Sequence, residues 1–307
     1  WISIAGVRGK GALAWISAPF RVAGAVLEAL RALRRRKPRA VLGMGGFVAG
    51  PGGVAAWLAR KPLLIHEQNS VAGTTNRLLA PLAKRVFEAF PGSFPASVRT
   101  EVIGNPVRRS LLAREAPRAR LVARRAERRR VLVIGGSQGA RVLNETLPRA
   151  LAGLPVDARP EVWHQAGRNG FAAAREAYAA AGVEARVVEF IEDMGGAYEW
   201  ADLVVARSGA LTVSELSTIG VGAILVPFKA AIDDHQTLNA RHFVMDGAAV
   251  LLAEQDLTPA ALENALRACL GDFDRLVQMA EAARAQAQTA AAEKLAAACL
   301  ELAEARA

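Results

Sequence analysis

The chain is poor in cysteine, histidine and aromatic residues. Its 307 residues include 2 cysteines and 4 histidines, and aromatic residues make up 6% of the total. Cys269 and Cys299 are too few for a disulfide framework, and neither lies in a Cys-x-x-Cys or Cys/His cluster. We expect both to be ordinary thiols in the core or on the surface.

Long apolar runs are also absent. No run approaches the roughly 20 residues that a membrane span requires, and the first residues do not resemble a signal peptide. The expected compartment is therefore the cytosol. The chain starts at Trp1 rather than Met, and Trp1–Ile4 already has the pattern of a strand, so we expect further residues upstream.

Basic residues are in excess, with a formal net charge of +10 at pH 7. Such a charge admits nucleic acid, an anionic membrane surface or acidic ligands as partners. No zinc finger, helix-turn-helix or RNA-binding aromatic motif accompanies it, so nucleic acid is not a predicted partner. Part of the excess is solvated arginine in a chain rich in alanine and arginine.

Short apolar strands alternate with helical patterns along the chain. We predict strands at residues 40–43, 63–66, 86–90, 100–103, 131–134, 161–164, 186–189, 203–206 and 223–227. This alternation predicts α/β domains with parallel sheets covered on both faces. The length allows two domains, which we place at 1–112 and 131–288, with an Arg-rich, solvated linker at 113–130.

The most informative stretch covers residues 203–216. A predicted strand ends in the small polar turn 207–210 and passes into a segment with Leu211, Glu215 and Leu216 at helical spacing. Small residues let a ligand approach backbone N–H groups that have no intrahelical partner, and such groups attract anions. Glu215 suits a pair of ribose hydroxyls better than a naked phosphate. The stretch predicts a site for a phosphorylated sugar or nucleotide, with an ordinary capped helix as the alternative.

Two glycine-rich stretches follow other predicted strands. In residues 43–53 we expect a loop whose backbone N–H groups close on a diphosphate, before a helix near 54–59. Residues 135–140 read Gly-Gly-Ser-Gln-Gly-Ala and lack the middle glycine of a dinucleotide fingerprint. The next strand ends in His164-Gln165 rather than an acidic residue, which disfavours a nicotinamide dehydrogenase.

Polar residues also end the strand at 63–66, where His66-Glu67-Gln68-Asn69 occupies the edge at which open α/β sheets bind ligands. We interpret His66 as structural rather than catalytic. No carboxylate or histidine cluster has metal-ligand spacing, so no tightly bound metal is expected. A Mg²⁺ held loosely by a diphosphate ligand is the one cofactor that the chemistry admits.

Six motifs, at residues 7–11, 43–53, 66–69, 104–108, 135–140 and 207–215, occur in the order of one family. The chain closely resembles, over its full length, the MurG family of bacterial glycosyltransferases in glycosyltransferase family 28, which make lipid II from UDP-N-acetylglucosamine (UDP-GlcNAc). The resemblance implies a GT-B fold of two Rossmann-like domains with parallel sheets facing across a cleft. It also implies a C-terminal helix, from about 289 to 307, that crosses back onto the first domain. The family's first loop, Gly-Gly-Thr-Gly-Gly-His, does not occur in this sequence, so we expect the N-terminal domain to be incomplete.

The resemblance assigns binding of the donor, UDP-GlcNAc, mainly to the C-terminal domain. In this assignment Ile191 would offer backbone hydrogen bonds to uracil, Glu215 would hold the ribose, and Arg108 would approach the nucleotide. Ser137 and the 209–212 turn would hold the phosphates, while Asn69, Ala210, Gln236 and Asn239 would meet the sugar. The full donor set is Asn69, Arg108, Ser137, Ile191, Ser208, Gly209, Ala210, Leu211, Thr212, Val213, Ser214, Glu215, His235, Gln236 and Asn239.

The acceptor, lipid I, is assigned to the first domain. Its diphosphate would lie at Gly45, Gly46, Gly50, Gly52 and Gly53. The helix predicted from Phe20 to Lys37 would lie near the membrane, with Phe20, Leu27, Arg31, Arg34 and Arg35 facing it. A plain surface helix that packs on the sheet is the simpler reading of the same pattern. Two residues depart from the family pattern: Phe47 stands where Tyr is common, and His235 where Gln is common.

The implied reaction is an inverting displacement, in which the 4-hydroxyl of the MurNAc unit attacks the anomeric carbon of GlcNAc and UDP leaves. Backbone N–H groups near Ala210, with Thr212 and Arg108, would stabilise the charge that grows on the β-phosphate. The general base of the family is a histidine in the absent loop, so we expect it upstream of Trp1 and assign no catalytic residue here.

Three hypotheses stay open at this point. The first is a peripheral enzyme at the cytoplasmic face of the bacterial inner membrane, which acts in peptidoglycan synthesis and so in cell-wall growth, cell shape and division. The second is a UDP-GlcNAc-binding module that is inactive without the missing loop. The third is another GT-B enzyme that uses a UDP-sugar, such as a glycolipid synthase or a UDP-GlcNAc epimerase, with a different acceptor loop.

Overall fold

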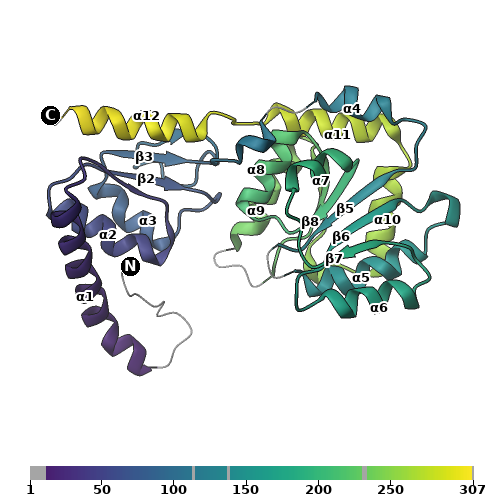
Figure 1. Ribbon diagram of the computed structural model, residues 1–307, viewed down its shortest axis with the longest axis horizontal. Coiled ribbons are helices and arrows are strands. Elements are labelled where there is room, and N and C mark those ends of the chain that lie inside the picture. Colours follow the sequence, from purple (N-terminus) through teal and green to yellow (C-terminus); the bar gives the residue numbers. More distant parts are fainter. Residues whose placement is uncertain (1–11, 113–114, 137–138, 230–233, 306–307) are drawn as a thin grey trace. The chain divides into compact units, whose positions relative to one another are not determined.

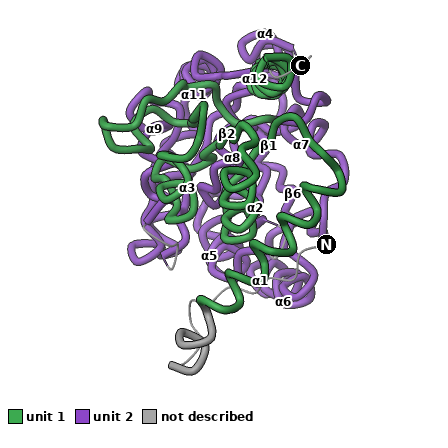
Figure 2. Tube along the Cα trace, turned by 90° about the vertical axis from the view of Figure 1, so that its left-hand side faces the viewer, with its two compact units in different colours: residues 1–106, 290–307 green, residues 107–289 purple. Residues whose placement is uncertain are grey.

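The computed structural model of this chain describes residues 12–112, 115–136, 139–229 and 234–305. It divides into two compact units, coloured separately in Figure 2. Unit 1 comprises residues 1–106 and 290–307, and unit 2 comprises residues 107–289. The strand expected at 1–4, the motif at 7–11 and Ser137 lie outside the described residues.

Unit 1 is built on a four-stranded parallel sheet in the order β1-β2-β3-β4. The strands are β1 (Val41–Gly43), β2 (Leu63–Glu67), β3 (Arg85–Glu88) and β4 (Glu101–Val102), and the helices are α1 (Ala12–Arg36), α2 (Gly46–Leu58), α3 (Thr74–Leu79) and α12 (Ala291–Glu304). Every residue of β2 is buried. A strand that is buried on both faces in this way is typical of a parallel sheet covered on both sides.

The two faces of β2 contact different helices, because successive side chains of a strand point to opposite faces. Leu63 and Ile65 pack with Leu79 of α3 and Ala56 of α2 in one core cluster. On the other face, Leu64 packs with Phe87 and with Leu295 and Ala298 of α12 in a second cluster. The last helix of the chain therefore covers one face of the first sheet (Figure 1).

Unit 2 is built on a six-stranded parallel sheet in the order β10-β9-β8-β5-β6-β7. Its strands are β5 (Arg130–Ile134), β6 (Glu161–Gln165), β7 (Arg186–Val188), β8 (Leu203–Ala206), β9 (Gly222–Leu225) and β10 (Ala249–Leu251). Its helices are α4 (Pro117–Ala123), α5 (Arg141–Ala152), α6 (Phe171–Ala180), α7 (Met194–Trp200), α8 (Ala210–Ile219), α9 (His235–Met245), α10 (Pro259–Leu270) and α11 (Phe273–Ala285). The central strands β5 and β8 pair with each other, and the chain runs outward from them in opposite directions. Open α/β sheets bind ligands at such a switch point.

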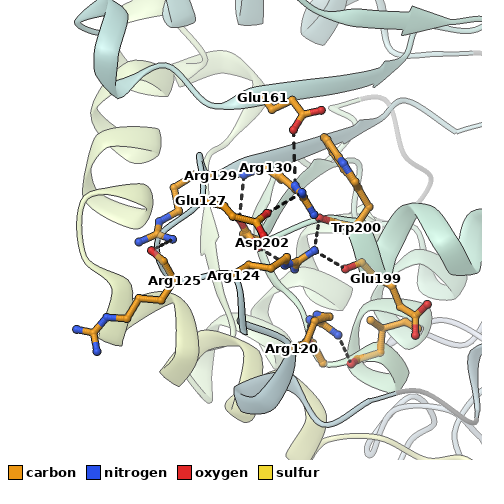
Figure 3. A network of polar contacts seen from close by, with 12 residues as sticks. Arg120, Arg124, Arg125, Glu127, Arg129, Arg130, Glu161, Glu199, Trp200 and Asp202 are labelled. Atoms are coloured by element: carbon orange, nitrogen blue, oxygen red, sulfur yellow. Dashed lines mark hydrogen bonds and ion pairs between the residues drawn. The ribbon is translucent and has the colours of Figure 1, made fainter. Parts of the chain in front are cut away.

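The structure divides the chain elsewhere than at the predicted linker 113–130. The boundary falls after Pro106, and α4 packs within unit 2 against α11. Arg120 is 5% exposed and donates to the carbonyl oxygens of Ile219 and Gly220 at 3.3 and 2.6 Å (Figure 3). Burial, together with the charge of Arg124, lowers the pKa of Arg120 to about 10, which leaves it cationic at neutral pH. The interpretation of these arginines as merely solvated is therefore wrong for Arg120, which a carbonyl-rich helix end holds inside the unit.

The glycine-rich stretch 43–53 is largely helical rather than a loop. Helix α2 begins at Gly46, so the N–H groups of Gly50, Gly52 and Gly53 lie beyond its first turn, where helix geometry engages them internally. Gly53 is needed for packing, because a Cβ there would lie 2.6 Å from Leu79 Cδ1. Only Gly45 and Gly46, with φ of 76° and 72°, stand at the start of the helix, where N–H groups are free of helical partners.

Gly52→Ala and Gly53→Ala form a matched pair of substitutions within α2. Replacing glycine by alanine inside a helix stabilises it by about 0.5–1 kcal/mol, and at Gly52 no atom lies within 4 Å of the added methyl group. We expect G52A to raise the free energy of unfolding of unit 1 and G53A to lower it, because overpacking against Leu79 costs about 1–3 kcal/mol. Native-state hydrogen exchange of the β2 amides measures both effects. Equal stabilisation by the two variants would contradict the close contact between α2 and α3.

Candidate functional site

A cavity of about 620 Å³ lies at the carboxyl ends of β5 and β8, where the strand order of unit 2 turns. Loops after β5, β8 and β9 and the segment after β10 contribute its walls. The residues that line it are Ile134, Gly135, Gly136, Gly139, Ala140, Arg141, Val142, Glu145, Arg207, Gly209, Thr212, Phe228, Gln236 and Glu254. The cavity is thus in the place where this fold class binds nucleotides and other phosphorylated ligands.

The start of α8 faces this cavity through Gly209 and Thr212. Gly209 is the N-cap residue and offers no side chain to cap the helix. The first intrahelical hydrogen bond is donated by the Val213 N–H to the Gly209 carbonyl, so helix geometry leaves the N–H groups of residues 210–212 for another acceptor. With the positive end of the helix dipole, they form a place for a phosphate group.

The charged side chains of the cavity neutralise one another. Arg141 Nε lies 2.6 Å from Glu145 Oε1, and Arg207 Nη1 lies 2.7 Å from Glu254 Oε2. Arg207 Nη1 also donates to the carbonyl oxygens of Val226 and Pro227, which holds its side chain against β9. These arginines already have carboxylate partners. An anionic ligand would therefore be attracted mainly by the backbone N–H groups at the start of α8.

The loop between β5 and α5 is shaped by close backbone contacts. Gly139 has φ of 76°, and a Cβ there would overlap the Ala166 carbonyl group. The Gly139 N–H donates to the Gly136 carbonyl oxygen at 2.9 Å. Only glycine fits at position 139. The described glycines of this loop, Gly135, Gly136 and Gly139, therefore bring backbone to the cavity wall.

Glu215 lies one turn inside α8 and is held by a residue that sequence reasoning missed. The hydroxyl of Tyr198, on α7, donates to Glu215 Oε2 at 2.9 Å. Arg108 Nε lies 4.0 Å from Glu215 Oε1, and the Glu215 side chain is 15% exposed. Burial raises the pKa of Glu215, and the Tyr198 hydrogen bond and the charge of Arg108 oppose that rise. Arg108 and Glu215, two residues of the predicted donor set, therefore lie close together.

Several predicted donor residues face inward. The Ser208 hydroxyl, fully buried, donates to the Gln236 carbonyl oxygen at 2.8 Å, and Asn239 Nδ2 donates to the Ser208 carbonyl oxygen at 3.2 Å. Val213 is 3% exposed, in the core, and the Ser214 hydroxyl donates to the Ala210 carbonyl oxygen at 2.9 Å. Ser208, Val213, Ser214 and Asn239 belong to the predicted donor set, and in this structure their side chains contact the protein's own core and backbone. Ser208 and Asn239 fix the turn before α8.

Other predicted donor residues remain exposed or line the cavity. Gln236 lines it, and its Oε1 accepts a hydrogen bond from the Phe228 N–H at 2.9 Å. His235 is half-buried at the first residue of α9, and the Leu211 side chain is 53% exposed. The Ile191 side chain is buried, which leaves its backbone as the part available to a base.

In unit 1, the residues His66 to Asn69 form a support rather than an open site. Glu67 is 4% exposed, and its carboxylate accepts from the Asn69 N–H, Asn69 Nδ2, the Gly73 N–H and Asn76 Nδ2. His66 Nε2 contacts the Gly104 carbonyl oxygen at 2.9 Å, so this nitrogen carries the proton, and burial lowers the pKa of the ring. The interpretation of His66 as structural agrees with this geometry. The Asn69 amide, predicted to meet a sugar, is held by Glu67.

Gln68 connects this support to the start of α2. Its Nε2 donates to the Met44 carbonyl oxygen at 2.7 Å, one residue before Gly45. A Cβ at Gly45 would lie 3.2 Å from Gln68 Oε1 and from Asn76 Nδ2. The amide side chains of Gln68 and Asn76 therefore hold the turn that precedes α2. Its N–H groups keep a defined direction as a result.

Glu254 and Phe228 were missed together with Tyr198. Glu254 lies three residues after β10, a three-residue strand that the sequence pattern did not reveal. Phe228, 44% exposed, follows β9, and the Arg207 guanidinium carbon lies 5.2 Å from its ring centroid. Had β10 been recognised, the carboxylate just past its end would have been a candidate by the same rule that selected His66 to Asn69.

Comparisons with known proteins find family matches in both units of the chain. The Glycosyltransferase family 28 C-terminal domain matches residues 130–295, and the Glycosyltransferase family 28 N-terminal domain matches residues 1–88. Two curated relatives carry the name UDP-N-acetylglucosamine--N-acetylmuramyl-(pentapeptide) pyrophosphoryl-undecaprenol N-acetylglucosamine transferase. The relative from Nitrosococcus oceani is 57% identical over 99% of this chain and 84% of its own length, and the relative from Marinobacter nauticus is 53% identical over 98% and 83%.

Solved structures confirm the predicted fold. A crystal structure of Acinetobacter baumannii MurG matches with a TM-score of 0.84 and 40% identity, over 98% of this chain and 84% of that chain. UDP-GlcNAc 2-epimerase from Neisseria meningitidis, bound to UDP-GlcNAc, matches with a TM-score of 0.63 and 13% identity, over 92% and 81%. The second likeness shows the fold alone. Together they identify the GT-B architecture of two parallel-sheet α/β domains.

Ser208→Ala and Thr212→Val compare two hydroxyl groups. The Ser208 hydroxyl is bonded within the protein, whereas Thr212 lines the cavity. We expect T212V to weaken binding of UDP, the nucleotide expected from the sequence, roughly tenfold, because hydrogen bonds to charged groups are the stronger ones. S208A should leave the affinity within about twofold and lower the free energy of unfolding by about 1 kcal/mol. Calorimetric titration with UDP and urea unfolding measure the two effects. A larger loss of affinity in S208A than in T212V would contradict the inward orientation of Ser208.

Proposed function

The chain belongs to glycosyltransferase family 28, and from this membership we propose that it transfers N-acetylglucosamine from UDP-GlcNAc to lipid I to make lipid II. The observation that carries the proposal is the start of α8, with N–H groups free for a phosphate, one turn from the buried carboxylate of Glu215. Phosphate and ribose are the two parts of a nucleoside diphosphate that all such donors share. The curated relatives, 57% and 53% identical, supply the sugar and the acceptor through their names.

The leaving group determines what the cavity must do. When the bond from the anomeric carbon to UDP breaks, negative charge grows on the β-phosphate. N–H groups at the start of α8 and the Thr212 hydroxyl would stabilise this charge, and they need no rearrangement because α8 is already formed. A helix terminus contributes about 0.3–2 kcal/mol, so positioning of donor and acceptor must supply most of the rate enhancement.

The 4-hydroxyl of the MurNAc unit is the attacking group, and it must lose a proton to a base. His66 is not a candidate, because it is fully buried and its Nε2 is bound to the Gly104 carbonyl oxygen. We therefore assign the base to no residue that the structure describes. A Mg²⁺ would be held by the diphosphate of the donor, because within the described ranges no group of three or more His, Cys, Asp or Glu could hold a metal ion.

Glu215→Gln tests the donor site. The variant keeps the shape of the side chain but loses the charge that accepts hydrogen bonds from the ribose, so we expect UDP-GlcNAc to bind roughly tenfold or more weakly. The matched control is Glu263→Gln, which removes a carboxylate paired with Arg267 on α10. Calorimetry measures the affinities, and turnover is followed with a lipid I analogue. A folded parent chain that does not bind UDP-GlcNAc would refute the donor site, whereas binding without turnover would favour a binding module.

The pH dependence of binding gives a second test of Glu215. Burial raises the pKa of this carboxylate, and the ionised form is the one that accepts two ribose hydroxyls. Affinity should therefore be complete above this raised pKa and fall as the pH decreases through it. In E215Q the same pH interval should show no such fall, and an unchanged profile in the variant would assign the titration to another group.

We infer further that the enzyme works as a peripheral protein at an anionic, cytoplasmic membrane surface, where its lipid-linked acceptor would lie. Phe20 and Leu27 of α1 are 79% and 54% exposed, and Arg31, Arg34 and Arg35 are exposed at its end. Arginine near exposed apolar side chains suits an anionic headgroup layer. In the described part of the chain, no helix is both long and apolar enough to cross a bilayer. Roles in cell-wall growth, cell shape and division would follow from lipid II synthesis.

Replacing Arg31, Arg34 and Arg35 together by Gln tests the membrane surface. Each arginine near an anionic bilayer contributes about 1 kcal/mol, so we expect binding to phosphatidylglycerol vesicles to fall roughly a hundredfold, with little change for phosphatidylcholine vesicles. The matched control replaces Arg149, Arg168 and Arg175, exposed arginines of unit 2, and changes the net charge equally. Vesicle sedimentation measures the binding. Equal losses in the two triple variants would indicate a general charge effect rather than a surface on α1.

A further inference from the structure

A buried tyrosine lies directly behind Glu215. Tyr198 is 1% exposed and stands on α7, a helix whose first turn is capped by Asp193 through the Gly196 N–H. Its hydroxyl donates to Glu215 Oε2 at 2.9 Å. A phenol in the core needs a hydrogen-bond partner, and in this unit the partner is the carboxylate that we assign to the ribose.

The Tyr198 hydroxyl remains a donor throughout the working pH range. Burial, followed by the neighbouring charge of Glu215, raises the pKa of Tyr198 well above its ordinary value. The phenol therefore keeps its proton, and Oε2 of Glu215 keeps a fixed partner. The second oxygen, Oε1, points to the side of the partly exposed Arg108, whose Nε lies 4.0 Å away. Tyr198 therefore fixes the Oε2 atom of Glu215, and the Oε1 atom lies on the side open to a ligand.

Elements that pack on α8 bring few other charges to Glu215. Helices α7, α9 and α11 and the turn η2 (Arg109–Leu111) all contact α8. Arg284 of α11 donates to the Thr218 carbonyl oxygen and Asn239 of α9 to the Ser208 carbonyl oxygen, at the two ends of α8 rather than at Glu215. Tyr198 from α7 and Arg108 at the start of η2 are the groups that oppose the effect of burial on the Glu215 pKa.

We propose that Tyr198 is a positioning residue for nucleotide binding, which holds Glu215 Oε2 so that the carboxylate presents Oε1 and its remaining lone pairs to the ribose hydroxyls. This inference rests on the proposed function of Glu215. A glutamate without this anchor would sample several rotamers, and ordering them on binding would lower the affinity. The hydrogen bond also favours the ionised carboxylate, which is the form that accepts from hydroxyl groups.

Tyr198→Phe removes the anchoring hydroxyl and keeps the ring that fills the core. We expect the Kd for UDP, measured by calorimetry on the full chain at neutral pH, to rise about five- to tenfold. The pH midpoint of binding should move upward, because the hydrogen bond that lowers the Glu215 pKa is lost and burial acts with less opposition. In turnover assays, KM for UDP-GlcNAc should rise while kcat changes little, since Tyr198 does not touch the reacting atoms.

The chain contains a matched control in Tyr178. Its hydroxyl is bound to His164 Nδ1 at 2.9 Å, and it is 3% exposed within the same unit. Tyr178→Phe therefore removes a buried hydroxyl with one side-chain partner, away from Glu215. We expect a comparable loss of stability in both variants but no change in UDP affinity or pH midpoint for Y178F. A merely structural role for Tyr198 would make the two variants alike in every measurement.

A third variant separates failure of this inference from failure of the proposed function. In a Glu215→Ala background, Y198F should have no further effect on UDP affinity, because the oxygen that it anchors is gone. If the parent does not bind UDP, or E215A binds as tightly as the parent, the donor site itself is wrong. If E215A is weakened but Y198F retains the parent's Kd and pH midpoint, the donor site stands and the role of Tyr198 is refuted.

Discussion

The unpaired N–H groups at the start of α8 are the feature on which the rest of unit 2 depends. They attract an anion only if the helix keeps its direction relative to β8, and both ends of α8 are fixed for this purpose. At the start, the Ser208 hydroxyl and carbonyl group are bound to α9. At the end, Arg120 donates to the Ile219 and Gly220 carbonyl oxygens and Arg284 to that of Thr218. The Arg-rich segment before β5 thus stabilises a site that it does not touch.

Pairing among the cavity's own charges explains how a basic protein avoids an indiscriminate anion site. Arg141 and Arg207 each have a carboxylate partner, so their charges are compensated before any ligand arrives. Directional N–H groups then select an anion by position rather than by charge alone. In the proposed function, the hydroxyls of a ribose one turn away would donate to Glu215, a contact that inorganic phosphate cannot make in the same way. The excess positive charge that gives the net charge of +10 therefore lies outside the cavity. The exposed arginines of α1 carry part of it.

Local patterns predicted the parallel sheets and the strand, turn and helix around Gly209, because strand periodicity and helix starts are properties of short segments. Directions of side chains were not predictable in this way. Ser208 and Asn239 have the chemistry of ligand contacts, but tertiary packing turned both inward. Gly52 and Gly53 were predicted in a loop because glycine usually interrupts helices. In the structure both lie in α2, and Gly53 allows the close packing of α2 on α3. Arg120 was taken for solvated because its carbonyl partners lie about 100 residues away.

Both units place a buried polar layer behind the residues that the family pattern marks. In unit 1, Glu67 gathers donors from Asn69, Gly73 and Asn76, and Gln68 holds the turn before α2. In unit 2, Tyr198 holds Glu215. A hydrogen-bonded layer of this kind is rigid, because losing any one partner leaves a buried polar group unpaired. Family resemblance alone does not distinguish a residue that binds from one that supports, since both are required for the same activity. Burial and hydrogen-bond partners make that distinction. By this criterion Glu67, His66 and Tyr198 support their surroundings, whereas Glu215 is the residue that we propose to bind the ligand.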